Sequence, residues 1–519
     1  MALLAVGWKS VTTPLVDHFH EGEYLGHLRQ LAEHRAGDAP FPLLTHGAMD
    51  YLPSQLATLL HGVDAAIVGT RAINVLLTGC NLWLLMWMLV ELGRRAGVDR
   101  ALRLTACGLL AALLFADVRD AAALHQRVLN PRDSALLLMM ALALLHHGTV
   151  GAGRGVALAL AVGAVATVAP FWAYDRGLVT LCAFVAFVAG LAWRGRWLDL
   201  SAAAAGALAT LALLDATRVM GDIGANLDNV RYWLEHAALW RVPFDSSVAL
   251  RALPLVVLDA AMLVALWRLA RAAWRADDRA TFTWLAMLAG VALLLLRAAL
   301  NRPDSVHLYW AIWPALLGTA AAVAPLLGDR VRLRASLAVA QPLAVGRALE
   351  IAALALATCL LLWGVARGPT AALAGLVDPR PNARVLSDPD LMRALGSFRT
   401  LRPRCVLAWS NSGTIALLAD LPHCAGVPYP AFVAPPLERD YLAELGAAPP
   451  RAILHDAEAW SARIDGRTMA ARLPAVAEFI AAGYVEHARY GRWVVLAHRD
   501  VQAALVVAAS AIGSNGEVR

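Results

Sequence analysis

The sequence has little charge for its length and almost no lysine. Charged residues make up 16% of its 519 residues, whereas ordinary soluble proteins are about a quarter charged, and Lys9 is the single lysine. The other basic residues are arginines spread along the chain in short segments. A nucleic-acid-binding surface needs basic residues gathered in a stripe and interleaved with aromatics. The scarcity and spacing of charge therefore argue against a nucleic-acid partner.

Apolar residues are abundant: 59% of the chain is hydrophobic and the mean hydropathy is +0.58. Runs near twenty apolar residues, long enough to cross a bilayer as helices, recur from Ala65 to about Arg367. The pattern predicts a polytopic α-helical membrane protein with about eleven spans. They are expected near 1–16, 66–92, 102–116, 134–147, 155–172, 177–193, 199–214, 252–267, 280–296, 306–327 and 348–366.

The first predicted span is short and contains Lys9 and Pro14. It lacks the basic start and the small-residue cleavage site of a signal peptide, so we expect a shortened span and no cleavable signal.

The loops between these spans fall into two sets that predict the orientation of the chain. One set carries fifteen arginines in 55 residues, and the other carries twelve in 116 residues, mixed with aspartate and glutamate. Positive charge stays on the cytoplasmic side during insertion. The dilute loops, and the part of the chain after Arg367, are therefore predicted to face outward.

Carboxylates and histidines gather directly after the first predicted span. Asp17, His20, Glu21 and Glu23 lie within seven residues. A solvated loop can carry such charge without a function, but carboxylates at a lipid-embedded helix end are costly, which favours a water-filled site. There an ionised Asp17 can take a proton from a sugar hydroxyl, with the other three orienting it. A divalent cation such as Mg²⁺ or Mn²⁺ stays open as a cofactor, although no spacing here is diagnostic of metal ligands.

A second candidate region is the outer segment 301–307. It contains Arg302, Asp304 and His307, and Pro303 interrupts the helix. Because the planar arginine fork matches phosphate oxygens, Arg302 is a candidate ligand for a lipid-linked phosphate at the membrane surface. The alternatives are a local pair with Asp304 or contact with lipid headgroups.

Two further outer segments repeat the arginine and aspartate pattern. Arg127 and Arg132 lie in the segment 125–133 and are further candidates for phosphate contacts. In the segment 174–176, a structural ion pair between Asp175 and Arg176 is the favoured interpretation.

After Asp378 the apolar runs shorten to five or six residues and alternate with helical stretches. This pattern predicts a soluble α/β or α+β domain that serves as a lid or an acceptor-binding module. We expect strands at 406–409, 452–454 and 493–497, helices at 412–419 and 470–482, and a hairpin turn at 490–492. The chain divides into a membrane module at 1–367 with a first outer loop at 17–65, an extracytoplasmic domain at 368–500, and a tail at 501–519 without a predicted role.

Cysteine is too sparse to staple more than one loop. Four of the six cysteines lie inside apolar spans, which leaves Cys405 and Cys424. In an oxidising compartment these two are expected to form a disulfide that closes a loop of about twenty residues.

The many spans, the acidic first outer loop and the outward C-terminal domain together resemble the GT-C glycosyltransferases. The anchors of the resemblance are Asp17, His20, Glu21 and Glu23, and secondarily the 301–307 segment. It implies a multi-pass enzyme of a bacterial plasma membrane that moves a sugar from a polyprenyl-phosphate-linked donor to an envelope glycan or lipid, for cell-envelope polysaccharide assembly.

The resemblance also implies roles for individual residues. Asp17 becomes the general base of an inverting transfer, assisted by His20, Glu21 and Glu23. The donor phosphate is expected to contact Arg127, Arg132, Arg302 and His307. Substrate contacts are expected at His46, Asp50 and Asp304.

Two other classes of protein remain as alternatives. A transporter or lipid flippase would use the outer carboxylates as ion or proton sites, although we detect no internal repeat of the kind common in transporters. The third alternative is a non-catalytic protein of envelope polysaccharide assembly.

Overall fold

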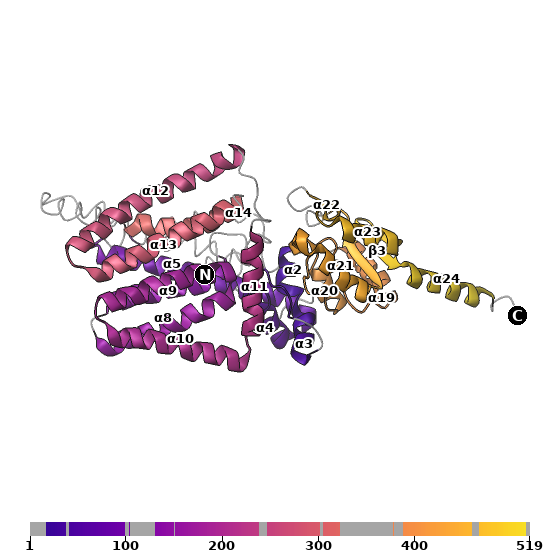
Figure 1. Ribbon diagram of the computed structural model, residues 1–519, viewed down its shortest axis with the longest axis horizontal. Helices are drawn as coiled ribbons and strands as arrows, with labels where there is room; N and C mark the ends of the chain where they lie inside the picture. Colours follow the sequence, from indigo (N-terminus) through magenta and orange to yellow (C-terminus); the bar gives the residue numbers. More distant parts are fainter. Residues whose placement is uncertain are drawn as a thin grey trace.

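The computed structural model describes residues 17–37, 41–98, 103, 130–149, 151–237, 246–301, 305–321, 377, 388–458 and 467–514. These residues form a helical bundle, a layer of short helices at one end of the bundle, and a C-terminal domain beyond that layer (Figure 1). We call the end of the bundle that faces the layer the domain end.

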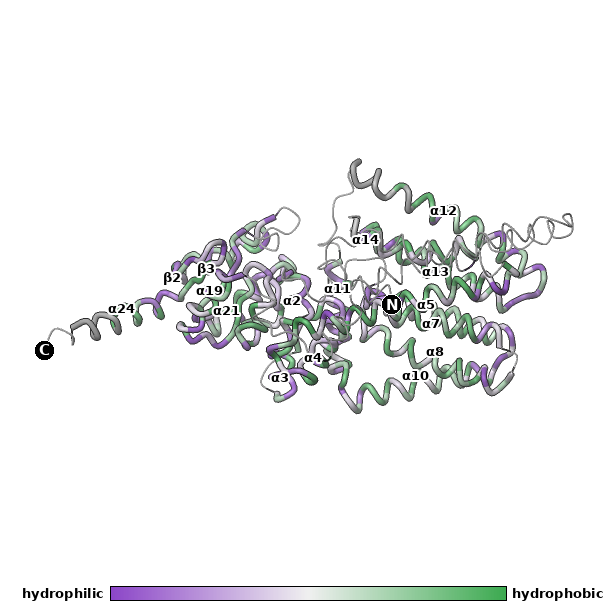
Figure 2. Tube along the Cα trace, turned by 180° about the vertical axis from the view of Figure 1, so that it is seen from behind, coloured by the Kyte–Doolittle hydropathy of each residue, from purple (hydrophilic) through white to green (hydrophobic). Residues whose placement is uncertain are grey.

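The bundle is built from long apolar helices. They are α5 (Ala66–Arg95), α7 (Ser134–His147), α8 (Ala152–Trp172), α9 (Tyr174–Trp193), α10 (Trp197–Thr217), α12 (Ser246–Arg275), α13 (Arg279–Asn301) and α14 (Ser305–Trp310), the last followed by a helix at Ile312–Ala321. Hydrophobic residues run along the bundle helices, and hydrophilic ones gather at the turns far from the C-terminal domain (Figure 2). The chain is a polytopic helical membrane protein: within its described part, five helices are long and apolar enough to span a bilayer.

The predicted spans agree closely with these helices where the two can be compared. The predicted span at 134–147 coincides with α7. Those near 66–92, 155–172, 177–193, 199–214, 252–267 and 280–296 lie inside single helices. The total of eleven stays a prediction, since the spans near 1–16, 102–116 and 348–366 lie outside the described residues.

Small residues bring α8 and α10 into direct backbone contact. A Cβ added at Gly163 would stand 1.9 Å from the carbonyl oxygen of Ala203, and one at Gly206 would stand 2.1 Å from that of Leu160. Helices in a bilayer associate through such close packing, because lipid offers no hydrophobic drive between them. These glycines therefore set the distance between the two helices.

The layer at the domain end is mostly helical, although the sequence predicted an outer loop at 17–65. It contains α2 (His20–Leu25), α3 (Leu28–Ala36), α4 (Leu52–His61) and α11 (Ile223–His236), with 3-10 turns η1 (Ala48–Asp50), η2 (Val63–Ala65) and η4 (Pro131–Asp133). Leu25, Leu31 and Leu44 are each at most 2% exposed. These short helices are thus held by burial between the bundle and the C-terminal domain.

The C-terminal domain contains a three-stranded antiparallel sheet in the order β1-β3-β2. The strands are β1 (Ala452–Asp456), β2 (Tyr484–Tyr490) and β3 (Trp493–His498), and the predicted hairpin turn at Gly491 is confirmed. Its helices are α19 (Pro389–Thr400), α20 (Thr414–Ala419), α21 (Glu438–Ala447), α22 (Met469–Arg472) and α23 (Pro474–Gly483), with 3-10 turns η6 (Pro430–Phe432) and η7 (Pro435–Leu437).

The disulfide between Cys405 and Cys424 is confirmed. The strand predicted at 406–409 is wrong, because the structure has only an isolated bridge there, between Val406 and His423. The disulfide fixes the start of this segment, and the chain then turns, with the Trp409 N–H donating to the Leu407 carbonyl at 2.9 Å. In the tail, α24 (Arg499–Ser514) forms a helix that extends away from the domain (Figure 1).

Candidate functional site

The chain folds back on the Asp17 side chain as it enters α2. Oδ1 of Asp17 accepts hydrogen bonds from the backbone N–H groups of Phe19 (3.1 Å) and His20 (3.0 Å). Oδ2 lies 2.7 Å from Nδ1 of the His20 ring. The side chains of His20 and Asp17 are 26% and 25% exposed, so the pair is fixed in place and still reachable by a ligand.

The environment of His20 favours its protonated form. Burial alone lowers the pKa of this ring, but the hydrogen bond to Asp17 and the charges of Asp17 and Glu23 outweigh burial and raise it. A positive charge beside Asp17 therefore persists to higher pH than an isolated histidine allows.

Glu21 is held in a buried ion pair with Arg71, near the start of α5. Arg71 donates through Nε to Oε1 and through Nη2 to Oε2, the latter at 2.8 Å. Oε2 also accepts the backbone N–H of Asp17 at 2.9 Å. Both charged side chains are under one tenth exposed. These contacts fix the segment that carries Asp17 against the bundle.

Glu23 is buried between the histidines of the site. It is 3% exposed, and its backbone N–H donates to the Phe19 carbonyl at 3.0 Å, whereas its carboxyl makes no hydrogen bond to another described residue. Burial raises the pKa of its carboxyl, while the charges of His46 and then His20 oppose the rise and Asp50 adds to it. A carboxyl group that stays protonated can donate a hydrogen bond as well as accept one.

His46 and Asp50 form a second acid and imidazole pair. The backbone N–H of His46 donates to Oδ2 of Asp50 at 2.7 Å, and Nδ1 of the ring lies 2.8 Å from Oδ1. Asp50 is fully buried. The carbonyl of His46 accepts the N–H of Tyr174 at 2.7 Å, which ties this pair to the start of α9.

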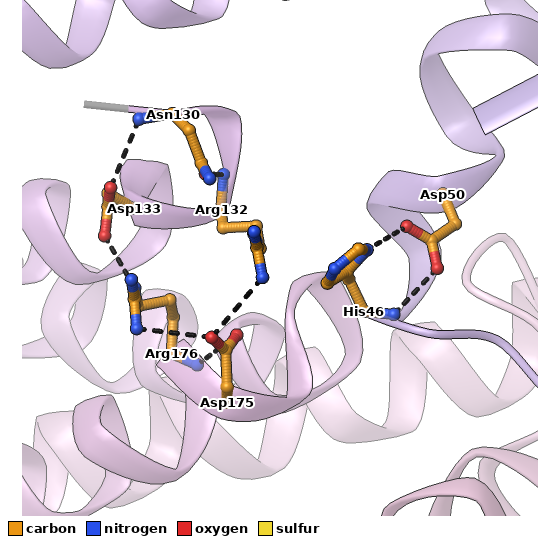
Figure 3. Close-up of polar contacts among 7 residues, drawn as sticks. All are labelled: His46, Asp50, Asn130, Arg132, Asp133, Asp175 and Arg176. Carbon is orange, nitrogen blue, oxygen red and sulfur yellow. Dashed lines mark hydrogen bonds and ion pairs between the residues drawn. The ribbon is translucent and has the colours of Figure 1, made fainter. Parts of the chain in front are cut away.

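Arginines and aspartates at the starts of α7 and α9 make an ion-pair network. Arg176 donates through Nε to Asp133 (2.8 Å) and through Nη1 to Asp175 (3.2 Å). The predicted pair between Asp175 and Arg176 is thereby confirmed and extended to Asp133. Figure 3 shows Arg132 and Arg176 converging on Asp175, with the His46 and Asp50 pair on a neighbouring segment.

The positive charge of Arg132 is less fully paired with carboxylates than that of Arg176. It is 7% exposed, its ion pair with Asp175 is long at 3.7 Å, and its Nε is buried without a hydrogen-bond partner among the described residues. Its guanidinium lies 4.0 Å from the centre of the Trp310 ring, and the His307 ring lies 4.4 Å from the same ring. Arg132 therefore has donor capacity left for an anion.

The C-terminal domain packs directly on this region. The hydroxyl of Tyr429 donates to the carbonyl of Phe19 at 3.2 Å, and the His18 ring is hydrogen-bonded to Thr414 at 2.5 Å. A Cβ at Gly22 would stand 2.8 Å from the backbone nitrogen of Gly413, so only glycine permits this approach. The domain thus covers α2 and lies close to Asp17.

The structure brings together most of the residues predicted from the sequence. The described ones lie in or just before four short elements: Asp17, His20, Glu21 and Glu23 at α2, His46 and Asp50 at η1, Arg132 in η4 and His307 in α14. Arg127, Arg302 and Asp304 lie outside the described residues.

Three participants were not singled out from the sequence. They are Arg71, Trp310 and Tyr429. Arg71 could have been identified from the sequence, because an ionisable residue inside an apolar span generally pairs with another group or has a function. The two aromatic residues carried none, since their contacts are with residues far away in the chain.

In the described part of the chain, no group of three or more histidine, cysteine, aspartate or glutamate side chains is arranged to hold a metal ion.

Neither a family model nor a curated protein sequence matches the chain. Two solved structures are similar to it over almost their whole length: crystal structures of ArnT from Cupriavidus metallidurans, bound to undecaprenyl phosphate and in the apo state. The TM-score is 0.48 for both, the sequence identities are 18% and 17%, and each comparison covers 95% of this chain and 96% of the other.

Proposed function

We propose that this membrane protein is a glycosyltransferase. It takes a sugar from a polyprenyl-phosphate-linked donor and delivers it, with inversion, to an envelope glycan or lipid on the outer face of a bacterial plasma membrane. The observation that carries the proposal is the fixed and partly exposed pair of Asp17 and His20 at the domain end. In the same region, the Arg132 guanidinium has an Nε without a hydrogen-bond partner among the described residues.

In this mechanism Asp17 is the general base. Two backbone N–H groups and the His20 ring fix its carboxylate before any substrate binds. A base held in place can take the acceptor's hydroxyl proton as that oxygen attacks the anomeric carbon. The bond between that carbon and the carrier phosphate breaks in the same step, and the phosphate leaves with the electron pair. A single displacement of this kind inverts the anomeric configuration.

The other acidic residues have supporting roles in the proposal. Glu21 positions the Asp17 segment through Arg71, because both of its oxygens are already used. Glu23 and His46 contact the sugar, and the buried Asp50 acts through the His46 ring that it holds. The Glu23 carboxyl has no hydrogen-bond partner among the described residues, and its raised pKa suits a donor to a sugar oxygen.

The donor phosphate binds at Arg132. Arg176 is neutralised by two close carboxylates, whereas Arg132 has one at 3.7 Å and an unbonded Nε. The Trp310 ring orients the Arg132 guanidinium from one face, which leaves its edge for phosphate oxygens. His307 is proposed beside it, and the predicted contacts at Arg127, Arg302 and Asp304 stay part of the proposal.

Transfer of a radiolabelled sugar from a panel of synthetic polyprenyl-phosphate sugars to envelope fractions tests the function. Asp17→Asn is expected to abolish transfer without changing the melting temperature of the purified protein. Asp500→Asn is the matched control, because Asp500 also faces a histidine, His498 at 3.6 Å, but its side chain is 93% exposed and lies in α24, outside the candidate site. Transfer by Asp17→Asn at the unmodified rate would refute the assignment of the base.

A buried carboxylate inside the bundle favours one second candidate, proton-coupled transport. Asp259 in α12 is 1% exposed, and neither oxygen has a hydrogen-bond partner among the described residues. Ionisable groups within a membrane often mark proton or ion pathways. Lipid or sugar movement in vesicles that is lost in Asp259→Asn and kept in Asp17→Asn would favour transport over transfer.

A further inference from the structure

A cavity of about 630 Å³ opens between α3, the start of α4 and the turn from α10 to α11. Its volume lies within the range of about 300–1,000 Å³ typical of small-molecule sites. The turn after α10 lines the cavity, and α10 ends at the domain end of the bundle (Figure 1). The residues that matter for its chemistry are Arg35, Phe41, Tyr51, Arg218 and Asp222.

The turn after α10 is shaped to build the cavity wall. Arg218 and Gly221 both have positive φ, 49° and 81°. A Cβ at Gly221 would stand 2.7 Å from the Phe41 ring, so glycine lets the turn close on that ring. Phe41 and Tyr51 both line the cavity, so its wall includes aromatic rings.

The lining carries positive charge that no described carboxylate pairs with. The Arg35 guanidinium donates a hydrogen bond to the amide oxygen of Gln55 at 3.2 Å, and neither Arg35 nor Arg218 forms an ion pair with a described residue. Among the described lining residues Asp222 is the one acid, and it caps α11 by accepting the N–H of Ala225 at 3.0 Å. The cavity thus has two guanidinium groups available to an anion.

A buried hydroxyl at the wall supports the same conclusion. Tyr51 is 1% exposed, and its hydroxyl has no hydrogen-bond partner among the described residues. Burying a hydroxyl without a partner is costly, and such groups in native structures generally await a water, an ion or a ligand.

The cavity adjoins the candidate site without sharing its residues. Tyr51 directly follows Asp50, whose carboxylate holds His46. Arg132, the proposed donor ligand, lies on a different segment, at the start of α7. A transferase needs a second substrate position beside its reacting centre, and this cavity stands next to Asp50.

We propose that this cavity binds an anionic saccharide, the phosphate- or carboxylate-bearing sugar of the acceptor. Arg35 and Arg218 bind its anionic group, Phe41 and Tyr51 contact the sugar ring, and the Tyr51 hydroxyl bonds to a sugar oxygen. The assignment of this ligand as the acceptor rests on the proposed transferase function.

Binding can be measured on the full-length protein in nanodiscs of phosphatidylcholine. The probes are glucose 6-phosphate, a free sugar phosphate, and short-chain phosphatidylinositol 4-phosphate, a lipid-borne one. Arg35→Ala and Arg218→Ala are each expected to weaken binding by about tenfold or more, because each removes a charge-assisted contact. Arg231→Ala is the matched control, since Arg231 lies on α11, pairs with Glu235 and does not line the cavity.

Arginine-dependent binding of either probe supports the site, and the tighter probe shows whether the ligand is free or lipid-borne. Equal binding of inorganic phosphate and glucose 6-phosphate would overturn the saccharide part. Undiminished binding by the combined Arg35→Ala/Arg218→Ala variant, or binding of neither probe, would overturn the site. Polyprenyl phosphate binding, measured on the same samples, should be unchanged in both variants. If no sample bound polyprenyl phosphate, the proposed transferase function would be contradicted, but arginine-dependent binding of the sugar phosphates would still support the anion site.

Discussion

The ion pair between Glu21 and Arg71 gives a prediction that separates positioning from chemistry. Both side chains are under one tenth exposed and joined by two hydrogen bonds. Removing one partner of such a pair leaves a buried uncompensated charge and costs about 3–5 kcal/mol, which is more than about a hundredfold in the folding equilibrium. We therefore expect Glu21→Leu and Arg71→Leu each to lower the melting temperature strongly and to reduce transfer.

The double variant Glu21→Leu/Arg71→Leu should recover most of that stability, because two apolar groups of similar volume can replace a buried pair at little cost. The double variant should stay less stable than the wild type by about 1–3 kcal/mol, because the backbone N–H of Asp17 loses the Glu21 oxygen that accepts it at 2.9 Å. Thermal unfolding in detergent of the wild type, both single variants and the double variant completes the cycle.

Glu235→Leu serves as the control, because its pair with Arg231 is exposed and should leave the melting temperature nearly unchanged. The reasoning is refuted if the single variants melt like the wild type. A Glu21→Gln protein of unchanged stability that has lost all transfer would instead make Glu21 a chemical participant.

Three further predictions concern other parts of the molecule. Arg132→Ala should weaken polyprenyl phosphate binding by about tenfold or more, and Arg132→Lys should restore only part of it, as measured by titration in nanodiscs. Burial lowers the pKa of His27 to about 4 and that of His423 to about 3, both below the ordinary histidine value of 6.5. The unfolded chain therefore binds protons first, and the stability of the fold should fall as the pH drops from about 6.5 towards 4. The fall should be smaller in His27→Gln, as measured by melting temperatures at a series of pH values. Reducing the Cys405 and Cys424 disulfide, which closes a 19-residue separation, should destabilise the C-terminal domain by about 3 kcal/mol in urea titration.

The elements that depend on local pattern were predictable from the sequence. Apolar runs located the bundle helices because a span needs a long, uninterrupted apolar segment. The turn at Gly491 and the disulfide followed from residue type and spacing. The short helices within 17–65 were not foreseen, because burial between the bundle and the C-terminal domain stabilises them, and a polar, weakly periodic sequence does not reveal that burial.

The same distinction applies to the candidate site. Asp17 and His20 are three residues apart, so their contact is a property of the local chain. Arg71 reaches Glu21 across 50 residues, and the aromatic ring over Arg132 comes from another helix. The sequence was enough to pick out residues with reactive or charged side chains. It could not show that both Glu21 oxygens already accept hydrogen bonds, while the Arg132 guanidinium still has donor capacity.

The central claim is that a lipid-linked phosphate binds at Arg132 with its sugar at Asp17. A cryo-EM map of the protein bound to a non-hydrolysable polyprenyl-phosphonate sugar tests it most directly. We expect phosphonate density within hydrogen-bond distance of the Arg132 guanidinium and sugar density against the Asp17 and His20 pair. Carrier density that lies among the bundle helices, away from both residues, would contradict it.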